Sequence, residues 1–420
     1  MSEHRQRPAP KRSGPKRLSS SILLVLASFP LWGCATDYVA RTGAVRSAYQ
    51  SHRYEDALLA LDQEEKRELD KDRLLVLLDK GMVLHSGGRY EESIQVLAEA
   101  EKLADQLEVI SVSEEAATLL INERERAYRG EDFEKLMINV LQALNYARLG
   151  RDEDALVEVR RADLRLKRMV DDEKKPYEQL AIARYLGGVL REDQKDYDSA
   201  FIDYYKAWKL QPSLEHLGGP LVRLAKQLER AEYEELRAAF PEADEGLLGP
   251  DEGEVVVIVE AGLSPEKSSL TRDEGGQLLA VPMYRDRWSR SGAAVTIGEQ
   301  ARSTVTVTNL EAVATLHLNE RIGRMIAKSL ASTAVKAGLA AGVGALAKDK
   351  NAGLAAFALM TLVNQPDLRS WLSLPAEFQL ARFRLPKGTH AVKVECGGRV
   401  AEQTVEVVPG RIGVVVVRSY

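Results

Sequence analysis

The sequence predicts a multidomain chain of α plus α+β class, with an N-terminal α-helical array and a C-terminal β-sandwich-like domain that holds an inserted helical hairpin. Apolar residues recur at helical spacing over residues 45–240. Short β-branched runs separated by Gly and Pro turns dominate residues 254–420. Residues 241–253, between these two parts, are rich in Pro, Gly and acidic side chains, which indicates a linker.

Residues 1–33 have the pattern of a secretory signal peptide. Six Lys or Arg and one Asp or Glu occur there, and the apolar run 22–32 is too short to cross a bilayer comfortably as a permanent anchor. Because Cys34 follows directly, Leu31-Trp32-Gly33-Cys34 resembles the lipobox of bacterial lipoproteins. Trp32 departs from the small residue usual at its position, and an ordinary signal peptide with a chance cysteine is the alternative.

The lipobox resemblance implies how the mature protein is held. In that family the matching cysteine is acylated with fatty acids such as palmitate and becomes the first residue, so Cys34 is the expected lipidation site. Residues 34–44 then form a tether between lipid and fold. Ala35 is not the Asp that retains lipoproteins at the inner membrane under the enteric rule, so we expect the periplasmic face of the outer membrane.

Charge and cysteine content restrict the partners. The formal charge is −5 for the whole chain and −10 without residues 1–33. An acidic chain is a poor candidate for binding phosphate backbones, so we expect no nucleic-acid partner. The second cysteine is Cys396, which has no intramolecular disulfide partner once Cys34 is lipidated. The fold therefore depends on its hydrophobic core.

Four segments in 45–240 share one local pattern: a turn, an aromatic or acidic pair, then Ala or Ser opening an apolar helix. The last, from Tyr197 to Pro212, has the spacing of the second half of a tetratricopeptide repeat (TPR). Small residues let two helices approach, an aromatic ring fills the gap, and Pro ends the pair. The residues expected in these packing roles are Tyr54, Ala57, Gly88, Tyr90, Gly150, Ala155, Tyr197, Ala200, Tyr204, Ala207 and Pro212.

The repeat spacing is uneven. Tyr54 and Tyr90 are 36 residues apart, but Tyr90 and Asp152 are 62 apart. We therefore expect a degenerate TPR-like array with an extra helical piece near residues 111–140. An irregular helical bundle is the alternative.

The C-terminal part shows the alternation and turn residues of a sheet domain. Strands are expected at 254–260, 278–283, 293–297, 303–308, 378–383, 390–394, 403–408 and 412–417. A helical insertion at about 319–363 separates the two groups of strands. Its apolar stretches 339–346 and 354–362 are short of the roughly 20 residues of a membrane-spanning helix. We expect a buried hairpin, with peripheral contact to the bilayer as the alternative.

No motif points to catalysis, a cofactor or a metal. The six histidines, at positions 4, 52, 85, 216, 317 and 390, have no paired spacing, and no zinc, EF-hand, P-loop or nucleophile-elbow motif occurs. The letters G-x-G-x-x-A at 342–347 lie in a helix-like run instead of after a strand, so they predict no dinucleotide site. The sequence therefore predicts a protein that is not an enzyme.

Several stretches resemble a little-characterised family of bacterial lipoproteins with a tetratricopeptide-like helical domain and a C-terminal β-rich domain. They are residues 128–134, 143–146, 155–160, 253–257, 260–267, 366–371 and 374–375. The resemblance covers residues 34 to about 395 and implies a place in the cell envelope. Its motifs have no assigned chemistry. Similar lipoproteins are associated with activation of peptidoglycan synthases.

The leading hypothesis is a lipid-anchored envelope protein that binds a protein partner through its TPR-like helices, because stacked helix pairs present an extended concave face. A narrower alternative makes the partner part of the peptidoglycan synthesis or division machinery. An alternative of another class is a cell-wall or carbohydrate-active enzyme, which requires a pocket with two convergent carboxylates or a polarised histidine.

Overall fold

The structure is a computed structural model that describes residues 38–67, 69–114, 126–171, 180–270, 281–287, 291–319 and 367–420, with the single residues Gly338, Ala341 and Ala345. Two compact units divide at Arg41. In the first, Tyr38–Arg41 form the short helix α2, inside the segment predicted as a tether. The second unit runs from Thr42 to Tyr420 and contains every other described element.

The predicted helical region is confirmed, and its helices form successive pairs that we call the helical layer. The pairs are α3 (Gly43–Gln50) with α4 (Tyr54–Glu65), α5 (Arg73–Ser86) with α6 (Tyr90–Glu114), α7 (Asp132–Arg148) with α8 (Asp152–Asp171), α9 (Ala181–Asp193) with α10 (Tyr197–Leu210), and α11 (Gly218–Gln227) with α12 (Tyr233–Ala239). Short 3₁₀ turns at Asp70–Asp72 and Glu215–Leu217 precede α5 and α11.

The turn inside each of the first four pairs has the same backbone geometry. A residue with positive φ lies two positions before the second helix: His52, Gly88, Gly150 and Lys195, with φ of 57°, 77°, 69° and 66°. The next N–H in each case donates to the carbonyl five residues earlier, as from Arg89 to Leu84, which is the Schellman closure of a helix end. The four segments with a shared sequence pattern are therefore the four turns.

A small buried side chain follows each turn. Ala57, Ser93, Ala155 and Ala200 each lie three residues into the second helix, and all four are fully buried. The pair α9 and α10 crosses closely at a glycine: a Cβ on Gly188 of α9 would lie 2.5 Å from Cδ1 of the buried Tyr204 on α10. The aromatic ring therefore occupies the space that a side chain at Gly188 would need.

Two four-stranded sheets and a two-stranded ribbon follow the helices. Their strands are β1 (Glu252–Ala261), β2 (Glu266–Leu270), β3 (Val281–Arg285), β4 (Ala294–Ile297), β5 (Gln300–Ser303), β6 (Val305–Asn309), β7 (Glu377–Pro386), β8 (Gly388–Cys396), β9 (Arg399–Val407) and β10 (Ile412–Ser419). The larger sheet has the order β10-β1-β7-β6, the smaller sheet β5-β4-β8-β9, and β2 pairs with β3.

The central strand β1 explains why its sequence is an almost unbroken β-branched run. It pairs with β10 in parallel and with β7 in antiparallel orientation, and both of its faces are buried. Val255, Val257 and Val259 contribute to the core between the two sheets. Its alternate residues face the helical layer, and two of them, Glu254 and Glu260, are charged.

The predicted strands differ from the structure in three places. Strand β2 has no predicted counterpart, β9 begins at Arg399 instead of at 403, and one predicted strand is divided. The residues predicted as a single strand at 303–308 divide at Thr304 into β5 and β6, which belong to different sheets. The Thr304 hydroxyl donates to the Ala293 carbonyl and accepts from the Ala293 N–H, so this residue fixes the point where the chain changes sheet. A strand-period pattern continues through such a change and does not reveal it.

Two further expectations fall largely outside the described residues. The strand predicted at 278–283 has a described part only from Val281, the start of β3. Residues 310–319 are helical, but the rest of the predicted hairpin at 319–363 lies outside the described residues apart from its three single positions. In the part of the chain that is described, no helix is long and apolar enough to cross a membrane.

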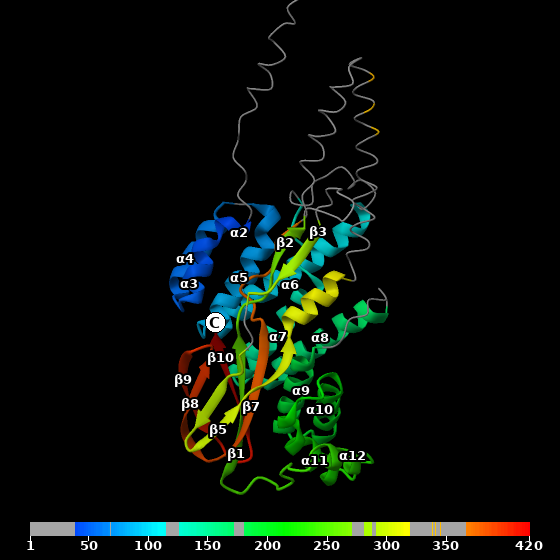
Figure 1. Ribbon diagram of the computed structural model, residues 1–420, viewed down its shortest axis with the longest axis vertical. Helices are drawn as coiled ribbons and strands as arrows, with labels where there is room; N and C mark the ends of the chain where they lie inside the picture. Colours follow the sequence, from blue (N-terminus) through cyan, green and yellow to red (C-terminus); the bar gives the residue numbers. More distant parts are fainter. Residues whose placement is uncertain are drawn as a thin grey trace, which may run out of the picture. The chain divides into compact units, whose positions relative to one another are not determined.

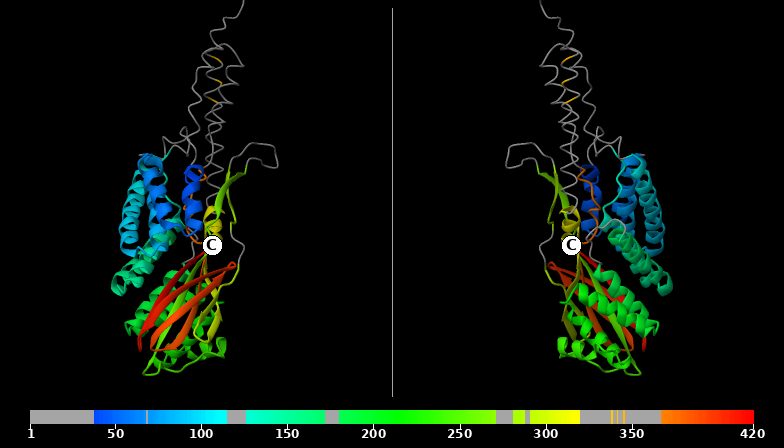
Figure 2. Two further views of the ribbon diagram at one scale, coloured as in Figure 1. Left: turned by 90° about the vertical axis from the view of Figure 1, so that its left-hand side faces the viewer. Right: turned by 90° about the vertical axis from the view of Figure 1, so that its right-hand side faces the viewer.

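The helical layer packs on the larger sheet. Helices α7 and α9 contact β10, and α9 also contacts β6. Figure 1 shows α9 and α10 beside strands β1, β7 and β10, and Figure 2 shows the same packing from two further sides. The helices and the sheets from Thr42 onward therefore form one compact body.

The Gly188–Tyr204 contact gives a test of helix packing. Gly188→Ala should destabilise the protein by about 1–3 kcal/mol, because the new methyl group forces the Tyr204 ring out of its position. Gly219→Ala on α11 is the matched control, because its nearest neighbour would be 3.8 Å away and alanine favours helix. Urea unfolding of the two variants checks this, and equal stability would contradict it.

Candidate functional site

The residues predicted for packing roles lie in the helix pairs, in their turns or just beyond a helix end. Tyr54, Tyr90 and Tyr197 begin second helices and are half-buried, whereas Tyr204 and Ala207 are fully buried within α10. Pro212 lies exposed just beyond α10. These residues hold helices together and do not converge on a cleft. Cys34 lies outside the described residues.

The face of the helical layer formed by α5, α7 and α9 is covered by the chain's own sheet. Arg148 at the end of α7 donates to the Val414 carbonyl of β10 at 2.6 Å, and the Asp193 carboxylate of α9 accepts from the Ile412 N–H at 2.7 Å. Both contacts close the outer edge of β10. A partner protein therefore does not find this face of the helices free.

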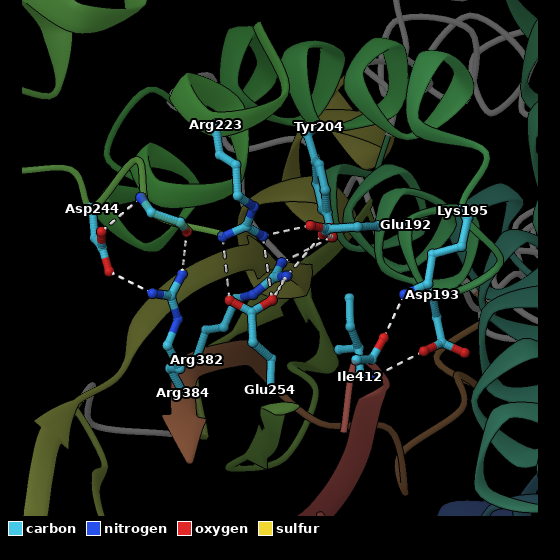
Figure 3. A network of polar contacts seen from close by, with 12 residues as sticks. Glu192, Asp193, Lys195, Tyr204, Arg223, Asp244, Glu254, Arg382, Arg384 and Ile412 are labelled. Carbon is cyan, nitrogen blue, oxygen red and sulfur yellow. Dashed lines mark hydrogen bonds and ion pairs between the residues drawn. The ribbon is translucent and has the colours of Figure 1, made fainter. Parts of the chain in front are cut away.

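A buried charge cluster of Glu192, Arg223, Glu254 and Arg382 lies at this interface (Figure 3). Arg382 of β7 forms ion pairs with Glu192 of α9, at 2.8 Å, and with Glu254 of β1. Arg223 of α11 also forms ion pairs with both carboxylates. Each side chain is at most 7% exposed, so two positive and two negative charges neutralise one another away from water.

Tyr204 completes this cluster. Its hydroxyl donates to Glu192 at 2.8 Å and accepts from Arg382 at 2.9 Å. Burial alone would raise the pKa of Glu192, but Arg382 and Arg223 outweigh it and lower that pKa to about 2. Glu192 is therefore ionised at neutral pH, and it holds helix and sheet together by charge-assisted hydrogen bonds.

A second polar chain crosses the interface at the other end of β1. The Ser93 hydroxyl donates to the Gly81 carbonyl and accepts from the Asn145 amide nitrogen. Asn145 Oδ1 lies 2.5 Å from His85 Nδ1, and His85 Nε2 lies 3.0 Å from Glu260 Oε1. The chain thus joins α6, α7 and α5 to β1.

The direction of these hydrogen bonds determines where the protons are. Because Asn145 uses its nitrogen as donor to Ser93, its oxygen must accept, and His85 Nδ1 carries a hydrogen. A hydrogen bond between His85 Nε2 and Glu260 Oε1 then requires a proton between these two atoms. Burial lowers the pKa of His85, but the Glu260 carboxylate outweighs it and the pKa is raised above its usual value.

A cavity of about 320 Å³ lies over this pair. Its lining residues are His52, Tyr54, His85, Ser86, Gly87, Gly88, Tyr90, Glu260, Ala401, Gln403, Val416, Val417 and Arg418. His85 and Glu260 are the polarised histidine and carboxylate that an enzyme would need. Both ring nitrogens of His85 are already in hydrogen bonds, however, and its side chain is 1% exposed. The histidine has no free nitrogen to act as a general base.

A third polar cluster surrounds the start of α7. Glu134 accepts from the Tyr128 hydroxyl at 2.6 Å and from the Trp371 N–H at 2.7 Å, and with Glu131 it forms a capping box. Burial, with the nearby charge of Glu131, raises the pKa of Glu134 to about 7. Arg369 reaches from the same segment to Asp72 at the start of α5. These contacts tie residues 369–371 to two helices.

Apart from Tyr204, which has a predicted packing role, sequence reasoning missed the members of these clusters. Glu254 and Glu260 flank the apolar run of β1, and Arg382 lies on the same face of β7 as Phe378 and Leu380. A charged residue inside an apolar strand is a usable signal, because such a residue is buried only with a partner. Metal binding has no support in the described part of the chain, where no group of three His, Cys, Asp or Glu side chains could hold an ion.

Comparison with protein-family models and with curated proteins gives no match. Solved structures of MamA are similar to about half of this chain. MamA AMB-1 is 17% identical and covers 49% of this chain and 91% of its own, with a TM-score of 0.31. MamA MSR-1 is 14% identical and covers 48% and 93%, with a TM-score of 0.28. TM-scores this low support no inference about function.

Removing one member of the charge cluster should leave an uncompensated buried charge. We expect Glu192→Gln to lower the free energy of unfolding by about 3–5 kcal/mol, because Arg382 and Arg223 lose their shared carboxylate. Glu235→Gln, at an exposed ion pair with Lys209, is the control and should have no measurable effect. Urea unfolding compares them, and equal curves would refute the role of the cluster.

The raised pKa of His85 predicts a pH dependence. A histidine whose folded-state pKa is raised contributes stability below its unfolded pKa of about 6.5, and this contribution is lost as the pH rises through the folded pKa. The free energy of unfolding should therefore fall above about pH 6.5, by at most about 1.4 kcal/mol per pH unit. His85→Gln should remove this part of the slope, whereas His390→Gln should retain it. Urea unfolding between pH 6 and 9 measures both.

Proposed function

We propose that this protein is a lipid-anchored scaffold of the bacterial cell envelope, attached through Cys34. It binds a partner protein on surfaces that the packed helices and sheets leave exposed. The observation that carries the scaffold role is the packing of the helical layer on the larger sheet. The buried charge cluster and the His85–Glu260 pair join helices and sheet into one compact body. Such a body suits a protein that presents a fixed surface.

The same contacts argue against the enzyme alternative. Its strongest candidate centre is the cavity over His85 and Glu260. Asn145 and Glu260 occupy the two nitrogens of His85, and Arg418 donates to backbone oxygens and to the Tyr49 hydroxyl. Both nitrogens of His85 and the guanidinium of Arg418 are therefore engaged in hydrogen bonds, although Glu260 Oε2 is buried without a partner in the described residues.

The covered helical face changes where a partner would bind. Stacked helix pairs commonly bind ligands along the face of their first helices. In this protein that face holds the larger sheet, through contacts of α5, α7 and α9 with β1 and β10. The partner would therefore contact the outer surface of the second helices or the smaller sheet.

The anchor has a direct test. Cys34→Ser should abolish incorporation of labelled palmitate and move the protein from the membrane fraction to the soluble fraction, because the lipid is attached through the cysteine sulfur. Cys396→Ser is the control and should keep the label, since that cysteine is buried between the sheets. In the same cells, crosslinking and recovery should yield a partner with the wild type and less of it with Cys34→Ser. Equal labelling of both proteins would refute the anchor, and recovery of no partner would refute the scaffold role.

A further inference from the structure

The four edges of the two sheets are protected to different extents. On β10 the outward groups of Ile412, Val414 and Val416 bond to the side chains of Asp193, Arg148 and Gln403. On β6 the Thr306 carbonyl accepts from Gln211. The edge strand β5 is four residues long. The fourth edge, β9, is nine residues long.

The hairpin geometry shows which backbone groups of β9 point outward. The loop between β8 and β9 consists of Gly397 and Gly398, with φ of 59° and 79°, which is the two-residue turn with both φ positive. Cys396 and Arg399 next to it are a hydrogen-bonded pair, and bonded and non-bonded pairs then alternate. The N–H and C=O groups directed away from β8 are therefore those of Val400, Glu402, Thr404 and Glu406.

No side chain or backbone group of the described residues caps these outward groups. Their side chains lie on the solvent side of the smaller sheet and are exposed, while Ala401 and Val405 between them pack on the core. Figure 1 shows β9 beside β8, at the end of the smaller sheet. Unpaired edges of this length are templates for strand addition, and proteins usually protect them. Gln403, which bonds to Val416 at the edge of β10, belongs to β9 itself, so the two edges lie beside each other and only the outward groups of β9 have no cap among the described residues.

The charges on this edge indicate what would pair with it. Glu402 and Glu406 lie on one face of β9, about 13 Å apart along the strand. Neither forms an ion pair among the described residues. Lys393, opposite Glu402, forms its ion pair with Glu395, and its charge also acts on Glu402. Exposed Val400 and Val408 flank the two carboxylates. The complementary strand has two basic residues four positions apart, with uncharged residues between them.

We infer that β9 is a docking edge for an extended polypeptide segment of a partner protein, with basic residues four positions apart facing Glu402 and Glu406. This rests on the proposed scaffold function and assigns the surface and the chemistry of its partner. Main-chain hydrogen bonds to the four outward residues supply affinity, and the two carboxylates supply register.

A second copy of this chain fits the edge less well. If two β9 strands pair antiparallel around Thr404, each Glu402 lies opposite the Glu406 of the other copy. Like charges directly opposite each other destabilise a strand pair. A basic segment removes this repulsion, which is why the proposal commits to it.

The test uses the purified full chain and two nine-residue fluorescent peptides of Val and Thr. One carries Lys at its third and seventh positions, and the other at its third and sixth, which places the two charges on opposite faces of a strand. Fluorescence anisotropy should show the first peptide binding about two- to fivefold tighter than the second. Absence of binding, or equal affinity of the two peptides, would overturn the proposal.

Variants separate charge attraction from strand addition. Glu402→Gln with Glu406→Gln should remove the preference between the peptides, while Glu299→Gln, in an exposed turn, should keep it.

Thr404→Pro removes an outward N–H without breaking the ladder to β8, and should weaken binding about tenfold. Thr404→Ala keeps the N–H and should bind as the wild type does. Normal binding by a folded Thr404→Pro would refute strand addition, and the paired Gln variants test the charges even if this proline variant does not fold.

The molecular mass of the purified protein in solution tests whether a second copy of the chain occupies the β9 edge. A dimeric wild type that becomes monomeric in Thr404→Pro would show that a second copy holds the edge, against the proposal. The result of the peptide assay does not depend on the lipid anchor, because the assay uses neither palmitate labelling nor crosslinking in cells. Failure of the peptide assay with successful recovery of a partner would leave the scaffold role standing and refute β9 as its site.

Discussion

The packing of helices on the larger sheet depends on charges that cannot be buried alone. Moving one Glu or Arg from water into the interior costs several kcal/mol, and the attraction of a partner offsets this only at close range and with good geometry. Glu192, Arg223, Glu254 and Arg382 come from α9, α11, β1 and β7. Any shift of the helices along the sheet would separate them. The cluster therefore specifies a single register of layer on sheet.

Strand β1 is held at both ends in this way. Glu254 and Glu260 are six residues apart and lie on the same face, so they are separated by roughly 20 Å along the strand. The first meets two arginines, and the second meets His85 of α5. Between them, Val256 and Ile258 are fully buried. Apolar packing holds the middle of β1 against the helical layer. The two carboxylates determine the position of the strand relative to the helices.

The sequence could predict the features that depend on neighbouring residues. The turn, the buried Ala or Ser and the following helix lie within a few positions of one another, so four segments with a shared pattern identified four turns of equal geometry. The charge cluster could not be predicted, because Arg382 and Glu192 are 190 positions apart and no pattern relates them. The parallel pairing of β1 with β10 could not be predicted for the same reason, and neither could the change of sheet at Thr304.

The covalent link between helices and sheet also limits how the protein can bind. An intramolecular contact acts at a high effective concentration, so a partner that competes for the face of the first helices must displace a sheet that never diffuses away. It must also leave buried charges unpaired while doing so. The edge of β9 imposes neither requirement, because no described residue bonds to its outward N–H and C=O groups. Strand addition at an open sheet edge therefore suits a protein whose helical face is already covered by its own sheet.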